Sequence, residues 1–155
     1  MLPLKRAKIK QHHYLKEKYP NESIDDYAKR SALELESKIL ELGPSNVCAF
    51  IGETMMGGLI GDVPPAKNYW KYIRNICDKY NVHLILDECW AGLGSSGKYY
   101  CCDWDNITPD FIFVAKILTS GYIPLSAVIT KKKFAAKIYN KFERLLHGST
   151  FQGLS

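Results

Sequence analysis

The hydrophobic positions of the chain follow two patterns, one typical of helices and one typical of buried strands. Apolar residues recur at helical spacing in three segments, residues 23–42, 66–80 and 131–142. Short, continuously apolar runs, typical of strands buried on both faces, occur at residues 47–51, 83–86, 111–115 and 125–130. Helices that alternate with such strands predict an α/β fold with a largely parallel sheet flanked by helices.

The composition adds a few exclusions to this fold. The 155 residues are enough for one compact core, and the net charge of +5 is spread along the chain, with a single tight basic cluster at residues 131–133. Neither a basic stripe nor a nucleic-acid-binding motif is present, so we expect no nucleic-acid partner. No apolar run is long enough to span a bilayer, and the first residues lack the apolar core of a signal peptide. We therefore expect no membrane association and a cytoplasmic location.

The cysteines and histidines do not form a metal-binding or disulfide pattern. The five cysteines are odd in number and include no C-x-x-C pair, and the four histidines do not complete a zinc-ligand spacing. We expect no metal site, and we expect most of the cysteines to be small buried residues.

Two charged residues stand at the ends of predicted strands. Asp87 closes the run at residues 83–86, and Lys116 follows the run at residues 111–115. Ligands of open α/β sheets bind outside the carboxyl ends of the strands, so both side chains reach one cleft if their strands share a sheet. A lysine at such a place is expected to be partly desolvated, which favours the neutral amine that attacks an aldehyde. An aspartate nearby suits a protonated pyridine nitrogen. A structural ion pair is the alternative interpretation of the same two residues.

Four motifs occur in order around this pair. The acid at the strand end is followed by a glycine-rich loop at residues 92–98, and Pro109–Asp110 precedes the apolar strand that ends at Lys116. Further along are a turn of small residues with Pro-Leu-Ser-Ala-Val at residues 124–128, and His-Gly-Ser-Thr-Phe at residues 147–151. With these motifs, over residues 45–153, the chain resembles the class III pyridoxal-phosphate (PLP)-dependent aminotransferases, a family of fold type I.

The resemblance implies a cofactor, PLP, and a role for several residues. Lys116 is similar to the Schiff-base lysine that also moves the substrate proton, and Asp87 to the partner of the pyridine nitrogen. Thr150 is similar to a phosphate ligand that reaches the neighbouring subunit's site, which implies a homodimer. Glu53 is expected near the cofactor, with its role left open.

Several positions depart from the family pattern. Cys89 stands where a branched aliphatic residue usually packs on the cofactor ring, and we expect the thiol to pack there. Trp90 replaces a frequent Gln, Ser95 a frequent Arg, and Thr54 the usual Pro. Gly58 replaces a glutamate that is frequent in members acting on ω-amino groups, which argues against that substrate group.

The family also predicts parts that the chain does not contain. Its members carry an upstream phosphate-binding loop and a downstream small domain with an arginine for the substrate carboxylate. Residues 1–155 are therefore expected to form part of the PLP-binding large domain, with the N-terminal part and the small C-terminal domain absent.

The leading functional prediction is a transaminase fragment, weak or inactive when isolated. It would take an amino group from a donor and pass it to a keto acid or aldehyde through Lys116. A PLP-dependent aminomutase or decarboxylase is an alternative within the same family. A non-catalytic remnant or interface piece is an alternative of another class, in which aromatic residues such as Tyr69, Trp70, Tyr99 and Trp104 face a partner.

Overall fold

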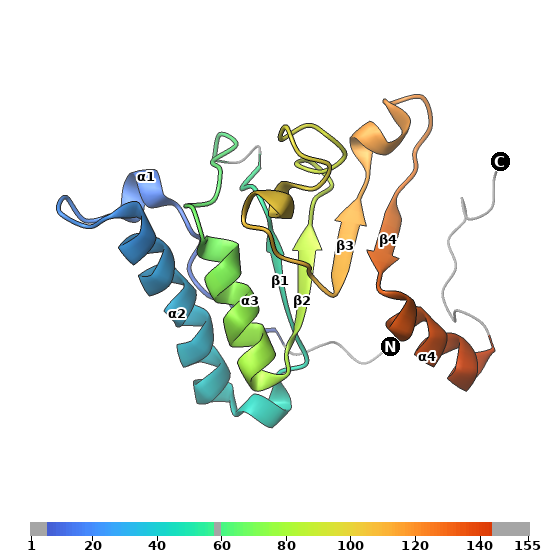
Figure 1. Ribbon diagram of the computed structural model, residues 1–155, viewed down its shortest axis with the longest axis horizontal. Helices are drawn as coiled ribbons and strands as arrows, with labels where there is room; N and C mark the ends of the chain where they lie inside the picture. The colour runs from blue at the N-terminus through green and yellow to red at the C-terminus, as the bar shows by residue number, and fades with distance from the viewer. Residues whose placement is uncertain (1–5, 58–59, 144–155) are drawn as a thin grey trace.

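The computed structural model describes residues 6–57 and 60–143, and these residues form a four-stranded sheet with helices around it (Figure 1). The strand order is β1-β2-β3-β4, with bounds Ala49–Glu53, His83–Asp87, Phe111–Val114 and Ala127–Thr130. The first three strands are parallel, and β4 runs antiparallel to β3. The predicted α/β fold with a largely parallel sheet is confirmed, with an antiparallel strand at one edge.

The three long helices occupy the predicted segments. The helices are α1 (Tyr14–Glu17), α2 (Ile24–Leu42), α3 (Tyr69–Tyr80) and α4 (Lys132–Phe142), and the 3₁₀ turns are η1 (Pro44–Asn46), η2 (Cys101–Trp104) and η3 (Lys116–Thr119). Helix α2 begins as its sequence predicts, because Ser23 Oγ accepts the N–H of Asp26 at 3.0 Å. It ends at Gly43, whose φ of 83° belongs to the left-handed region that favours glycine.

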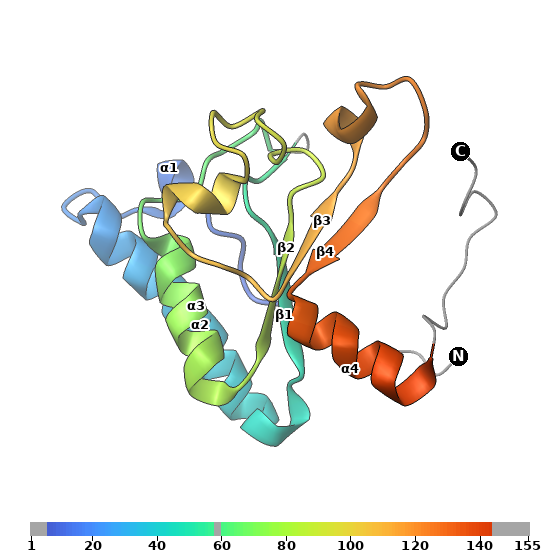
Figure 2. The same cartoon turned by 45° about the vertical axis from the view of Figure 1, so that its right-hand side comes forward.

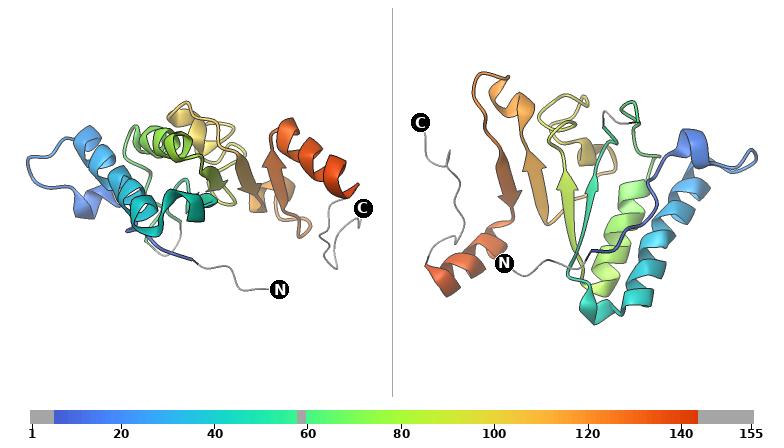
Figure 3. Two further views of the ribbon diagram at one scale, coloured as in Figure 1. Left: turned by 90° about the horizontal axis from the view of Figure 1, so that it is seen from below. Right: turned by 180° about the vertical axis from the view of Figure 1, so that it is seen from behind.

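The core lies where α2 and α3 pack together beside β1 and β2 (Figures 1 and 3). Leu84 and Leu86 of β2 are fully buried, and so is Trp70 of α3. Helix α4 lies beyond β4, at the end of the sheet opposite to α2 and α3 (Figure 2). The core therefore lies at the β1–β2 end of the sheet, while β4 and α4 contribute no buried residue to the core of the described chain.

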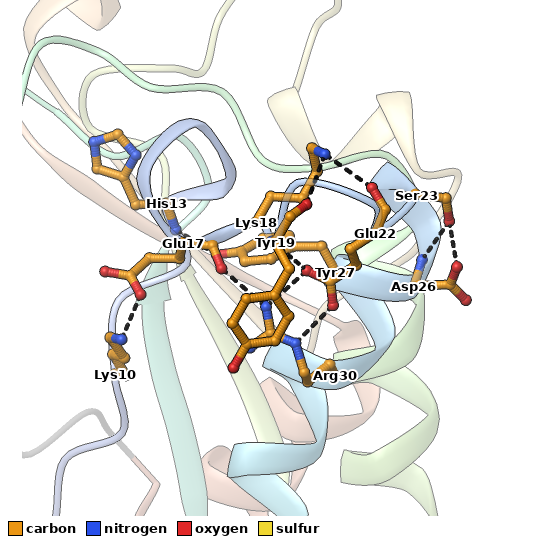
Figure 4. A network of polar contacts seen from close by, with 10 residues as sticks. All are labelled: Lys10, His13, Glu17, Lys18, Tyr19, Glu22, Ser23, Asp26, Tyr27 and Arg30. Carbon is orange, nitrogen blue, oxygen red and sulfur yellow. Dashed lines mark hydrogen bonds and ion pairs between the residues drawn. The ribbon is translucent and has the colours of Figure 1, made fainter.

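The N-terminal segment is fastened to α2 by a polar network (Figure 4). Arg30 donates to both carboxylate oxygens of Glu22, at 2.6 and 2.8 Å, and to the carbonyl oxygen of Glu17 at 2.9 Å. Its guanidinium also lies over the ring of Tyr19, 4.4 Å from the centroid. This network fixes the turn that joins α1 to α2.

Two predictions from the sequence concern the burial of the cysteines and of the aromatic residues. Cys77, Cys101 and Cys102 are buried as expected, whereas Cys48 is exposed, and all five cysteines are free. Tyr69 and Trp70 are core residues and face no partner, whereas Tyr99 and Trp104 are exposed. None of the helices within residues 6–57 and 60–143 has the length and apolar character needed to cross a membrane.

The parallel strands set the position of the site. Because β1, β2 and β3 run in one direction, the segments that follow them meet at a single edge of the sheet (Figure 1). Those segments begin at Thr54, Glu88 and Ala115. These segments, together with the last residues of β1 and β2, contain Glu53, Asp87, Cys89 and Lys116, four of the residues predicted to lie at the site.

Candidate functional site

Asp87 and Lys116 come from neighbouring parallel strands. Asp87 is the last residue of β2, where its backbone pairs with Phe113 of β3. Strand β3 ends at Val114, and Lys116 opens the 3₁₀ turn η3. Both side chains line one cavity of about 310 Å³ at the carboxyl ends of the strands. The predicted meeting of the two residues at this edge of the sheet is therefore found.

The cavity walls come from three chain segments. The segment after β1 and the segment after β2 supply most of the lining, and Lys116 alone represents the segment after β3. The lining residues are Glu53, Met55, Gly57, Asp62, Asp87, Cys89, Trp90 and Lys116. Three carboxylates and one amine thus share a space at the low end of the range of ligand pockets, about 300–1,000 Å³.

Lys116 differs from its prediction in one respect. Lys116 is exposed, so the partial desolvation of its amine that the sequence predicted is not found in the described chain. The reason is that the buried strand ends two residues earlier, at Val114, and places Lys116 in the first turn of η3. Its φ of 46° lies in the left-handed region, which costs a non-glycine residue free energy and is typical of functional positions.

The alternative of a structural ion pair is not supported by the contacts of the two residues. Within the described part of the chain, the ion pairs involve neither Asp87 nor Lys116. Asp87 Oδ1 instead accepts the backbone N–H of Cys89 at 2.9 Å. The amine of Lys116 and the carboxylate of Asp87 are therefore both available to a ligand in the cavity.

Cys89 and Trp90 continue the wall after Asp87. Burial, together with a hydrogen bond to Asp87, raises the pKa of the Cys89 thiol to about 11, so the thiol stays protonated and uncharged near neutral pH. Trp90 is 51% exposed at the mouth of the cavity. A neutral thiol in this place is consistent with the apolar packing role that the family resemblance gives it.

Glu53 lies where the sequence placed it, at the cavity, and its Oε2 accepts the backbone N–H of Gly57 at 2.9 Å. Met55 and Asp62 also line the cavity and were not predicted. Met55 lies in the bend that follows β1, and no local sequence pattern marks it as a lining residue. Asp62 lies in a loop whose path has no sequence signal.

Two positions of the sequence analysis fall outside the described residues. Thr150, the predicted phosphate ligand, lies beyond residue 143, and Gly58 lies between the two described ranges. The structure therefore brings together Glu53, Asp87, Cys89 and Lys116, and Thr150 remains a prediction.

Comparisons with known proteins identify the family of this chain. The family model for class-III aminotransferases matches residues 4–154 of the chain. A probable gamma-aminobutyrate transaminase 3, mitochondrial, from Oryza sativa subsp. indica is 37% identical, over 91% of this chain and 28% of the relative. The vanillin aminotransferase of Capsicum chinense is 38% identical, over 91% of this chain and 31% of the relative.

Solved structures give the same result. The omega transaminase from Pseudomonas jessenii in complex with PMP superposes with a TM-score of 0.82 at 34% identity, over 92% of this chain and 32% of that structure. The chain thus spans about a third of the length of the proteins that it matches. The family match extends over nearly all of its residues, and the chain therefore belongs to the class-III aminotransferase family.

Proposed function

We propose that this chain forms the Lys116 side of a PLP site and takes part in transamination, the transfer of an amino group from an amino donor to a keto acid or aldehyde. The observation that carries the proposal is the shared cavity of Asp87 and Lys116 at the carboxyl ends of two adjacent parallel strands. Because the chain spans about a third of its relatives, we further propose that it is part of a larger PLP-binding domain.

The residues of the cavity fit this cofactor chemically. PLP, when bound, supplies an aldehyde that condenses with amines and a ring that withdraws electrons from the bonds next to that nitrogen. A primary amine for the aldehyde and a carboxylate for the ring nitrogen line the same cavity. The PMP bound to the Pseudomonas jessenii omega transaminase is the aminated form of this cofactor, which supports the same assignment.

Each residue then has a defined task. The Lys116 amine would hold the cofactor through its aldehyde, at the place where the amine of the donor would later bind. Lys116 Nζ would then be the base that takes the proton from the α-carbon of the donor, and in the second half of the reaction the acid that gives a proton to the carbon of the acceptor. The Asp87 carboxylate would keep a proton on the ring nitrogen, and the uncharged Cys89 thiol would pack against the ring.

The partners and the location are proposed at the level of class. Thr150 is proposed as a phosphate ligand that reaches the site of a neighbouring subunit, which makes the complete enzyme a homodimer. Relatives named for gamma-aminobutyrate, an amine, and for vanillin, an aldehyde, are almost equally similar to this chain, so no single donor or acceptor is favoured. A cytoplasmic location remains a prediction from the sequence, and the rice relative is named as mitochondrial.

The test is a visible absorption spectrum of the purified chain with added PLP, followed by borohydride reduction and peptide mapping. We expect a yellow product, with the reduced adduct on Lys116. The adduct should be lost in Lys116→Ala and kept in Lys71→Ala, which removes an exposed lysine of α3. An adduct distributed over surface lysines, or no adduct, would overturn the proposed cofactor site.

A further inference from the structure

A fully buried carboxylate lies directly behind the cavity. Glu88 is 1% exposed, and within the described residues its carboxylate takes part in no ion pair. Its oxygens accept the backbone N–H groups of Cys101 at 2.7 Å and Cys102 at 2.9 Å, and the hydroxyl of Thr54 at 3.1 Å. An uncompensated buried carboxylate is costly, so these three donors are what keep Glu88 in place.

Thr54 is buried like Glu88 and takes part in three hydrogen bonds. It is completely buried, and besides the hydroxyl that binds Glu88, its backbone N–H donates to the carbonyl of Asp87 at 3.2 Å. Its own carbonyl accepts the indole N–H of Trp70 at 2.9 Å. The usual proline at this position has neither an N–H nor a hydroxyl, so two of these bonds depend on the threonine found here.

The neighbours of these two residues are the walls of the cavity. Thr54 stands between Glu53 and Met55 in the sequence, and both of these neighbours line the cavity. Glu88 stands in the same way between Asp87 and Cys89. Thr54 and Glu88 are fully buried and do not line the cavity, whereas the residues on either side of each of them do. The hydrogen bond between the pair therefore joins two cavity walls from behind.

Gly92 shows how closely the next segment approaches Glu88. Its N–H donates to the carbonyl of Glu88 at 3.0 Å, and a Cβ added at Gly92 would lie 2.9 Å from that carbonyl oxygen. A backbone atom cannot move aside as the end of a side chain can, so only glycine fits here. The segment that follows the cavity wall therefore packs directly against the backbone of Glu88 at Gly92.

We propose that Thr54 and Glu88 are positioning residues, whose hydrogen bond fixes the wall carrying Asp87 and Cys89 relative to the wall carrying Glu53 and Met55. Its consequence for the cofactor rests on the proposed function, because Asp87 has to meet the ring nitrogen at a fixed place. Neither residue of the pair lines the cavity, so neither is a catalytic residue.

The variant that isolates the bond is Thr54→Val, which keeps the size of the side chain and removes the hydroxyl. We expect the dissociation constant of PLP to rise about tenfold, because the wall that carries Asp87 and Cys89 loses its side-chain hydrogen bond to the wall that carries Glu53 and Met55. The midpoint of the pH titration of the visible band should also shift, because Asp87 moves relative to the ring. Thr54→Ser keeps the hydroxyl and should restore both values.

The control is Ile39→Val, which removes one methyl group from the core on α2 without touching the pair. It should lower the thermal stability and leave both PLP readouts unchanged. If Thr54→Val also lowers only the thermal stability, the pair is merely structural and the proposal is wrong.

A measurement without PLP separates this proposal from the proposed function. The rate at which iodoacetamide alkylates Cys89 reports on the position of its wall, and it should rise several-fold in Thr54→Val but not in Ile39→Val or Thr54→Ser. Failure of the wild-type chain to form the Lys116 adduct would contradict the proposed function alone. An unchanged alkylation rate in Thr54→Val would contradict the positioning role, whatever the outcome with PLP.

Discussion

Arg74 Nη1 lies 2.9 Å from Asp110 Oδ2, and this ion pair joins α3 to the residue that precedes β3. The same carboxylate oxygen accepts the backbone N–H of Leu84 in β2 at 2.9 Å. Both charged side chains are largely buried, with 13% and 10% of their surfaces exposed. One carboxylate therefore ties together three elements at the edge of the sheet opposite to the cavity.

Asp110→Asn is expected to lower the free energy of unfolding by about 3 kcal/mol, because it leaves the buried Arg74 guanidinium without its main counter-charge. Urea unfolding followed by circular dichroism measures the change. The matched control is Asp78→Asn, since Asp78 pairs with the same arginine at 2.8 Å but is 67% exposed. The control should cost less than about 1 kcal/mol. Equal losses in the two variants would contradict the importance of burial.

The contribution of Asp110 should also depend on pH. Burial alone would raise the pKa of Asp110, but the N–H of Leu84 and the guanidinium of Arg74 outweigh it and hold the pKa below the usual value. A lowered pKa in the folded state stabilises the protein above the pKa of the unfolded state, about 3.9. The stability gap between wild type and Asp110→Asn should therefore be constant near neutral pH and shrink below about pH 4. A gap that grows with acid would contradict this sign.

Burial of His12 should make the folding stability depend on pH in a second way. Its ring is 5% exposed and stacks on Tyr69 with centroids 4.2 Å apart. Burial lowers the pKa of His12 to about 4, although a hydrogen bond to the backbone of Glu53 acts in the opposite direction. Since the unfolded state binds this proton at about pH 6.5, stability should fall by up to about 3 kcal/mol between pH 6.5 and pH 4.

His12→Phe keeps an aromatic ring against Tyr69 and removes the titration, so its stability should fall less than that of the wild type over this range. Thermal melts at several pH values between 7 and 4 provide the comparison. Parallel pH profiles of the two proteins would show that His12 is not responsible for the loss.

The sequence predicted the sheet and the two central site residues because both depend on local patterns. Buried strands are apolar runs, and residues that follow them meet at one edge of a parallel sheet. The antiparallel direction of β4 was not predicted, although only a 3₁₀ turn lies between β3 and β4. A parallel pair usually needs a helical crossover, so the short connection was a usable signal.

Features that depend on distant residues could not be predicted in this way. Helix α3 begins at Tyr69, three residues later than predicted, because Asp105 accepts the N–H groups of Asn68 and Trp70, each at 2.9 Å. The hydrogen bonds of Glu88 likewise join it to Thr54 and to the start of η2. No local pattern marks such partners, which is why Thr54 and Glu88 behind the cavity were missed while Asp87 and Lys116, which line it, were predicted.

Arg30 is predicted to hold the N-terminal segment against α2. Its guanidinium lowers the pKa of Glu22 to about 2 and bonds the backbone of Glu17 as well. Arg30→Met keeps the aliphatic stem and removes all of these bonds, so the amides of residues 13–22 should exchange with deuterium several-fold faster. Hydrogen–deuterium exchange read by mass spectrometry tests this. Lys29→Met, which alters the exposed neighbouring residue, should leave the exchange unchanged, and an equal effect of both variants would rule out the network as the cause.

The backbone of Lys116 provides the last prediction. With φ at 46°, the residue adopts a conformation that costs an L-residue roughly 1 kcal/mol and costs glycine nothing. Lys116→Gly and Lys116→Ala both remove the amine, so their difference isolates the backbone. We expect the glycine variant to be more stable by about 0.5 to 1 kcal/mol in urea unfolding without PLP.

The comparison at Lys71, an exposed position within α3, should give the opposite sign, with alanine more stable than glycine by about 1 kcal/mol. The same sign at both positions would show that the left-handed conformation is not what distinguishes Lys116. Opposite signs would mean that the chain keeps a lysine at a position where its backbone favours glycine. A side chain retained against that cost is expected where its amine has a chemical task, and this is the task proposed for Lys116.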